Sequence, residues 1–194
     1  MDLERQKEKF KNHVAKFTDY GNIKILDFKR PNSSEYRIRF LFEEDYYRLH
    51  ISGDLGELIA TNYKNMCFED FEDFVNNTEY FEEKIDCMSR TLYFYDEEKA
   101  REDVNKLITE NDAWDDFMED RLDFETREDV LDDILAGFDD KRGISSEGYD
   151  ELSKGIIDPW YYASDAGKKN TGILELYMLA FKLAMKQLSE VGCE

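Results

Sequence analysis

The sequence predicts an α+β fold, in which an N-terminal antiparallel β-meander of three to four strands is preceded by a helix. An acidic helical region and a buried C-terminal helix follow. Three observations lead to this prediction. Residues 23–63 alternate apolar and polar side chains between short turns, residues 66–140 show helical periodicity, and residues 173–191 are apolar on most sides.

Composition indicates a folded chain. Hydrophobic residues make up 41% of the 194 residues and aromatic residues 14%, which is too much for a disordered acidic protein even though 37% are charged. Two prolines and ten glycines leave little room for linkers. We therefore expect a single domain over residues 1–194, with subregions at 1–65, 66–140 and 141–194, in which the sheet half and the acidic half form subdomains.

The first element expected is a helix over Leu3–Phe17, because Phe10, Val14 and Phe17 recur at spacings of three and four. Strands are then expected within residues 23–28, 36–42, 47–52 and 57–63. Alternation with period two and short connections is typical of an antiparallel meander with one buried face. The opposite face carries four basic or titratable side chains: Arg37, Arg39, Arg48 and His50.

Helical spacing begins at residue 66. Helices are expected over 68–75, 79–88, 96–109, 113–122 and 126–138, with a short strand at 91–95. Thr126 resembles the start of a capping box, since Asp129 follows three residues later. The last helix, Ile173–Val191, is too short and too interrupted by charge to span a bilayer, so we expect it at the centre of the core.

The net charge of −20 is concentrated in one stretch of the chain. Residues 66–140 hold 27 acidic and 7 basic residues, whereas residues 1–65 have a net charge of +1 and residues 141–194 of −1. Such a field repels nucleic acid and attracts proteins that bind nucleic acid. The pattern therefore indicates a protein partner more than a substrate.

Acidic residues recur four apart in this stretch, and such pairs share one face of a helix and destabilise it by a few tenths of a kcal/mol. A row of carboxylates roughly imitates DNA phosphates, which lie about 3.4 Å apart along a strand. A solvated surface of an ordinary acidic protein explains the same pattern. If the surface binds a partner, the residues expected to do so are Asp112, Asp115, Asp116, Glu119, Asp120, Glu128, Asp129, Asp132, Asp133, Asp139 and Asp140.

The cationic sheet face supports an alternative function. Side chains on neighbouring antiparallel strands lie about 5 Å apart, so Arg37, Arg39, Arg48 and His50 can form one patch that holds a nucleic-acid backbone. The structural explanation, which we favour, is that these side chains pair with the acidic helices or remain solvated.

Catalysis and cofactors have little support. No serine-hydrolase, phosphate-loop or dinucleotide motif is present, and the calcium-loop pattern is absent, so we expect no enzyme, no cofactor and no specific metal site. A metal-assisted carboxylate hydrolase stays open as an alternative, because 46 acidic residues always offer pairs. Cys67, Cys87 and Cys193 form no CxxC pair and indicate reduced thiols, and the first eleven residues lack a secretory apolar segment.

Four segments of the chain resemble small proteins encoded by phages and prophages of Gram-positive bacteria, and some acidic phage proteins of this size are similar to anti-CRISPR proteins. The segments are Asn32–Phe40, Leu49–Glu57, Tyr80–Ile85 and Ala180–Leu188. The resemblance implies an inhibitor, cytoplasmic in a bacterial host, whose partner is a CRISPR effector nuclease with its guide RNA. It implies a block of DNA binding or cleavage, and no site residue is carried over from it.

Overall fold

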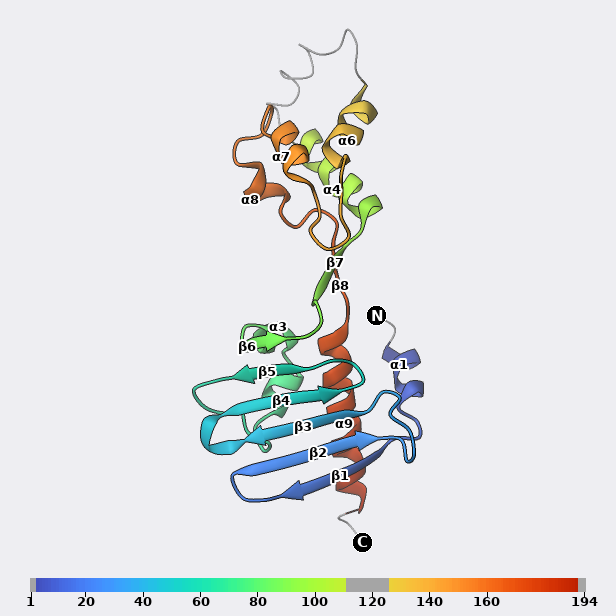
Figure 1. Cartoon of the computed structure of the whole chain (residues 1–194), viewed down its shortest axis with the longest axis vertical. Coiled ribbons are helices and arrows are strands. Elements are labelled where there is room, and N and C mark those ends of the chain that lie inside the picture. Colours follow the sequence, from blue (N-terminus) through green and yellow to red (C-terminus); the bar gives the residue numbers. More distant parts are fainter. Residues whose placement is uncertain (1–2, 111–125, 192–194) are drawn as a thin grey trace. The chain divides into compact units, whose positions relative to one another are not determined.

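The computed structural model describes residues 3–110 and 126–191, and the chain folds into two compact units. The first unit combines residues 1–92 with residues 172–194, and the second unit is formed by the intervening residues 93–171 of the chain (Figure 1). The sequence predicts one domain with subregions divided after residues 65 and 140. The two compact units have different boundaries, after residues 92 and 171. The predicted boundaries follow local charge, whereas a compact unit depends on which distant segments pack together.

Six antiparallel strands form the sheet of the first unit, and strands adjacent in the sheet are adjacent in the sequence (Figure 1). They are β1 (Val14–Asp19), β2 (Ile23–Lys29), β3 (Ile38–Glu43), β4 (Arg48–Gly53), β5 (Leu58–Thr61) and β6 (Ile85–Met88). Alternation places Ile38, Phe40 and Phe42 on the buried face, each 0% exposed. The α+β fold and the N-terminal meander are confirmed, and the sheet is larger than the three to four strands expected.

One long helix covers the buried face of this sheet (Figure 1). The helical elements of the first unit are α1 (Leu3–Lys9), the 3-10 turn η1 (Glu44–Tyr46), α2 (Glu72–Val75), α3 (Thr78–Glu82) and α9 (Ile173–Val191). Tyr177 of α9 is buried and its hydroxyl donates to the Leu55 carbonyl at 3.2 Å, and burial raises the pKa of Tyr177 to about 12. The buried C-terminal helix is confirmed. No helix in the described ranges is long and apolar enough to cross a membrane.

Two expected helices are wrong over part of their length, because each gives way to a strand. The helix predicted over Leu3–Phe17 stops at the end of α1, and β1 begins at Val14. Phe17 is half-buried and stacks on Phe68 with ring centroids 4.4 Å apart, whereas Val14 is 53% exposed. The helix predicted over Glu79–Met88 is likewise cut short by β6, which pairs with β5. Backbone pairing with a neighbouring strand outweighs local apolar spacing.

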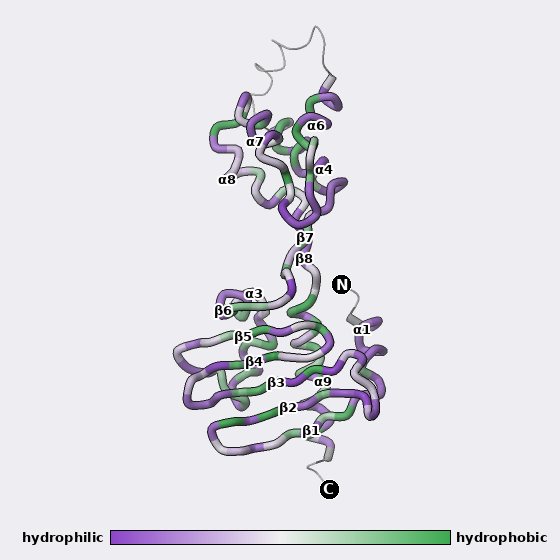
Figure 2. Tube along the Cα trace, viewed as in Figure 1, coloured by the Kyte–Doolittle hydropathy of each residue, from purple (hydrophilic) through white to green (hydrophobic). Residues whose placement is uncertain are grey.

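The second unit is mainly helical and has its own core. Its elements are β7 (Tyr93–Tyr95), α4 (Glu97–Thr109), α6 (Arg127–Leu135), α7 (Ser146–Leu152), α8 (Pro159–Ala163) and β8 (Lys168–Asn170). β7 and β8 pair antiparallel, so the two ends of the inserted unit lie side by side. Val104, Ile134 and Leu152 belong to the buried cluster. Figure 2 shows hydrophobic and hydrophilic residues intermixed along α4 and α6, as expected for helices with one buried face. The helix expected over 113–122 lies outside the described residues.

Local capping signals in the second unit behave as the sequence predicts. The Thr126 hydroxyl accepts from the Asp129 N–H at 3.3 Å, and the Asp129 carboxylate accepts from the Thr126 N–H at 2.7 Å. This reciprocal pair satisfies two backbone donors at the start of α6, so the capping box is confirmed. Asp96 caps α4 by accepting from the Lys99 N–H at 2.9 Å.

A buried histidine makes the stability of the first unit depend on pH. His13 is 3% exposed, and its Nε2 lies 3.1 Å from the Tyr36 carbonyl oxygen, while Nδ1 has no hydrogen-bond partner among the described residues. Burial lowers the pKa of His13 below the ordinary 6.5, since the charged ring loses its hydration. The unfolded chain therefore takes up this proton at a higher pH than the folded chain.

We expect the urea midpoint of the first unit to fall between about pH 7.5 and pH 5.5. The contribution of His13 to the free energy of unfolding is complete above pH 6.5 and is lost as the pH falls toward the folded pKa. His13→Gln should remove most of this slope, because a side-chain amide does not titrate. An equally steep slope in the His13→Gln variant would contradict the assignment.

Candidate functional site

Negative charge is concentrated in the second unit. Its 79 residues hold 24 Asp and Glu against 10 Lys and Arg, a net charge of −14, whereas the first unit has 22 against 16, a net charge of −6. The excess of acid recognised in the sequence therefore belongs largely to one compact unit.

An open groove of about 480 Å³ runs between α4 and α6. Its lining residues are Glu97, Glu98, Arg101, Glu102, Asn105, Glu128 and Leu131. We call this the acidic groove. The opposite side of α4 is buried through Ala100, Val104 and Ile108, so helical periodicity turns its glutamates outward. Four carboxylates thus surround a single guanidinium among the residues that line the groove.

Arg101 compensates part of this charge. Its guanidinium pairs with Glu128 at 3.3 Å and with Asp132, and the Asp132 carboxylate raises the pKa of Arg101. Over the described residues, no basic group lies within ion-pair distance of Glu97, Glu98 or Glu102. Glu97 makes a weaker Coulombic contribution to the raised pKa of Arg101. The Glu98 and Glu102 carboxylates therefore remain the most available to cations from outside the chain.

The predicted partner-binding residues meet different outcomes. Five of them lie outside the described residues: Asp112, Asp115, Asp116, Glu119 and Asp120. Glu128 and Asp132 flank Arg101 on α6, and Asp133 is exposed on the same helix. Asp129 belongs to the capping box, and its pKa is lowered by the Thr126 hydroxyl and N–H. Its carboxylate is engaged at the helix start.

Two further predicted acids lie in the connection after α6. The Asp139 carboxylate accepts the backbone N–H groups of Lys141 at 2.9 Å and Arg142 at 3.0 Å, which closes a tight turn. Asp140 is exposed, and its backbone carbonyl accepts from the Tyr95 N–H at 2.8 Å. Asp139 thus has a structural role, whereas the side chain of Asp140 faces solvent.

Sequence reasoning missed the contribution of α4. Glu97, Glu98 and Glu102 line the groove but are absent from the predicted site. Glu98 and Glu102 have the same i,i+4 spacing that singles out the later acids, so the signal is present in the sequence. Three basic residues in the same helix obscure it, because they lower the net charge of the segment.

The cations of the sheet face pair within the sheet. Arg39 on β3 forms two hydrogen bonds with Asp27, its register partner on β2, at 2.7 and 2.9 Å. Asp27 also raises the pKa of Arg39. The partner of Arg39 is therefore an acid of the sheet and not an acidic helix.

Among the described residues, the side chains of Arg48 and His50 also pair with an acid of the sheet, whereas that of Arg37 does not. The Glu43 carboxylate on β3 lies 3.5 Å from the Arg48 guanidinium and 3.1 Å from His50 Nε2, and both of these residues belong to β4. Arg37 lies just before β3, lines a polar pocket of about 300 Å³ and has no ion pair within the described ranges. The positive charge available to a phosphate backbone is therefore smaller than the sequence indicates.

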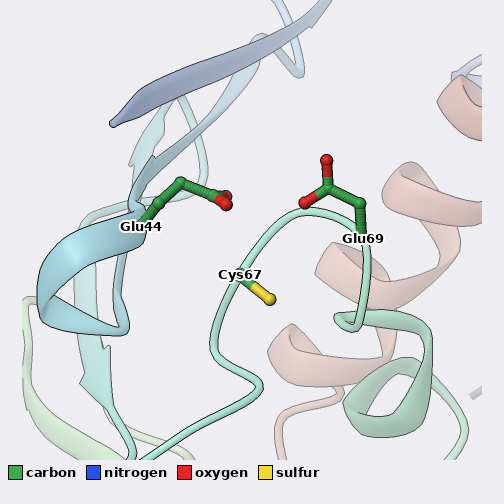
Figure 3. A group of neighbouring side chains, drawn as sticks. All are labelled: Glu44, Cys67 and Glu69. Carbon is green, nitrogen blue, oxygen red and sulfur yellow. The ribbon is translucent and has the colours of Figure 1, made fainter. Parts of the chain in front are cut away.

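A third group of side chains has the composition of a metal site. Glu44, Cys67 and Glu69 place their ligand atoms within 4.8 Å of one another. Figure 3 shows the two carboxylates directed toward each other, with Cys67 on the loop between them. Lys24 already binds both carboxylates: its Nζ is 3.3 Å from Glu44 and is paired with Glu69, which raises the pKa of Lys24.

The cysteine of this group is poorly suited to metal binding. Burial raises the pKa of the Cys67 thiol, which donates to the Asp70 carboxylate at 3.2 Å. A metal binds the thiolate, and a raised pKa disfavours that form. The group is therefore best explained as a pair of carboxylates that hold the Lys24 ammonium near the start of β2.

Comparison with known proteins finds no matching family model, no matching curated protein and no matching solved structure.

Proposed function

We propose that this protein binds a basic, nucleic-acid-binding host protein through the acidic groove and thereby keeps that partner from its nucleic acid. The observation that carries the proposal is the set of carboxylates of Glu97, Glu98 and Glu102, which have no ion pair within the described ranges and stand on one helix of a unit with a net charge of −14. The compartment proposed is the bacterial cytoplasm, where such partners work.

The chemistry of the groove suits lysine and arginine side chains. Carboxylates on a helix surface attract the cations that line a nucleic-acid channel, and the long-range field of the unit accelerates their encounter. Asp133 and Asp140 extend the negative surface beyond the groove. The resemblance to anti-CRISPR-like phage proteins selects a CRISPR effector with its guide RNA as the first partner to test.

The test adds the purified protein to a guide-loaded type II effector and follows target-DNA binding and cleavage in parallel. We expect both to be lost with the wild-type protein, because the groove competes for the DNA channel. A variant with Glu97→Gln, Glu98→Gln, Glu102→Gln and Asp133→Asn should require about tenfold more protein for half-inhibition, and this difference should shrink as salt is raised.

A matched variant removes the same number of charges from the first unit. It carries Asp45→Asn, Glu72→Gln, Asp73→Asn and Glu79→Gln, all at exposed positions that form no ion pair within the described ranges. It should inhibit like the wild type. Equal inhibition by the groove variant and the wild type, or equal weakening by the two variants, would refute a role for this groove.

A further inference from the structure

A cluster of large apolar side chains at α8 is exposed to solvent. Ile157 is 92% exposed, Trp160 59%, Tyr161 75% and Tyr162 61%. We call the three aromatic residues, Trp160, Tyr161 and Tyr162, the aromatic platform. Exposed tryptophan and tyrosine side chains in contiguous positions are characteristic of binding surfaces, where they provide most of the affinity.

The platform rests on a rigid base. The Trp160 ring stacks on buried Tyr149 of α7, with centroids 3.7 Å apart and planes 15° apart. The Tyr149 hydroxyl in turn donates to the Ala163 carbonyl at 3.3 Å, which ties α7 to α8. One face of the indole is therefore covered while the rest stays open, and little conformational entropy is lost when a partner binds there.

The two tyrosines that follow Trp160 pack against each other. The rings of Tyr161 and Tyr162 meet edge to face, with centroids 5.1 Å apart. Asp158, which precedes α8, is exposed and forms no ion pair within the described ranges. Open aromatic faces accept a cation on their flat side, and Asp158 adds a negative charge at the start of the same helix.

Other tyrosines of this chain already hold cations of their own. Lys84 lies 4.3 Å from the Tyr80 ring centroid, Lys168 lies 4.4 Å from that of Tyr93, and Arg48 is 5.7 Å from that of Tyr46. Within the described ranges, no lysine or arginine lies over the rings of the aromatic platform. These rings are open to a cation from another molecule.

Charge decides between the possible occupants. A second copy of this chain would bring another unit of net charge −14 against the first, and a nucleic acid would bring phosphates. Both are repelled, whereas a basic protein is attracted. Among basic side chains, the planar guanidinium of arginine stacks on aromatic rings and pairs with a carboxylate, which the compact ammonium of lysine does less well.

We propose that the aromatic platform binds arginine side chains of the partner and gives the protein a preference for arginine over lysine. The inference rests on the proposed function, since both require a basic partner. It adds a division of roles: the acidic groove attracts positive charge of either kind, and the platform selects arginine.

Fluorescence anisotropy with labelled nona-arginine and nona-lysine peptides tests this division. We expect the wild-type protein to bind nona-arginine about fivefold more tightly than nona-lysine. A Tyr161→Ala, Tyr162→Ala variant and a Trp160→Ala variant should lose most of this preference while nona-lysine binding stays unchanged. Trp160→Phe should retain part of it. Tyr20→Ala with Tyr63→Ala, at exposed positions of the first unit, should change neither affinity.

The outcomes separate this inference from the proposed function. Equal affinity of the wild type for the two peptides, or an undiminished arginine preference in the platform variants, overturns the inference. Unchanged nona-lysine binding by the variant with Glu97→Gln, Glu98→Gln, Glu102→Gln and Asp133→Asn refutes only the proposed role of the acidic groove. Concentration-dependent self-association, or binding of an oligothymidine strand, overturns the inference if the platform variants abolish it, because the occupant would then be a second copy or a nucleic acid. The double tyrosine variant leaves the Trp160–Tyr149 stack intact, so a folding defect in Trp160→Ala does not remove the test.

Discussion

Replacing Phe71 with alanine is expected to lower the free energy of unfolding of the first unit by about 3–5 kcal/mol. Phe71 is 0% exposed and meets Phe181 of α9 edge to face at a centroid distance of 4.9 Å. It also contacts Phe42 of β3 at 5.4 Å and Phe81 of α3 at 5.7 Å. Truncation removes the ring on which sheet and helices converge and leaves a cavity that the surrounding backbone cannot close.

Urea unfolding followed by far-UV circular dichroism and by hydrogen exchange of the β3 amides measures this loss. Tyr63→Ala is the matched control, since Tyr63 is 98% exposed and its removal should change the midpoint little. If Phe71→Ala shifted the midpoint no more than Tyr63→Ala, the aromatic cluster would not be the centre of the first core.

Gly148→Ala is expected to destabilise the second unit by about 1–3 kcal/mol or more. A Cβ atom at this position would lie 2.0 Å from the Ile134 carbonyl oxygen and 2.7 Å from Ile144 Cγ2. The carbonyl is backbone of α6 and cannot rotate away, so α6 and α7 must separate. Their separation opens the core that also supports α4 and therefore the acidic groove.

Tryptophan fluorescence reports this change selectively, because Trp160 stacks on Tyr149 in the second unit and residues 1–92 and 172–194 contain no tryptophan. The fluorescence midpoint in urea should fall for Gly148→Ala, while circular dichroism of the sheet should retain its own midpoint. Ser146→Ala, at an exposed position of the same helix, should leave both midpoints in place. An unchanged fluorescence midpoint for Gly148→Ala would show that the helices do not cross as closely as described.

The negative charge of the candidate site can be predicted from the sequence, but the geometry of the site cannot. The concentration of acid and the i,i+4 spacing identify α6 correctly as an acidic helix. Which carboxylates are free depends on contacts between helices: Arg101 of α4 engages Glu128 and Asp132, whereas Glu98 of the same helix has no ion pair in the part of the chain that the structure describes. Such pairings join residues about 30 positions apart, and no local pattern encodes them.

The aromatic platform shows the same division. Asp158-Pro159-Trp160 indicates the start of a short element, because proline suits the first position of a helix. The sequence pattern does not indicate whether Trp160, Tyr161 and Tyr162 are buried or exposed. Only the packing of α8 on Tyr149 shows that these rings remain exposed.

The sequence by itself determined those features whose cause is local. The alternation of Ile38, Phe40 and Phe42 determined the central strands, the Thr126 capping box determined the start of α6, and an apolar run determined α9 with the bounds found. Each depends on side chains a few positions apart, so a short window of sequence contains the whole signal.

The tertiary structure decided what depends on distant partners. β1 and β6 became strands because β2 and β5 supply the backbone hydrogen bonds at their edges, against helix-like spacing in their own sequences. The two compact units likewise follow from the pairing of β7 with β8 and from the return of α9 to the sheet. Pairing energies of this kind arise between segments brought together by folding, so the sequence of either segment alone does not contain them.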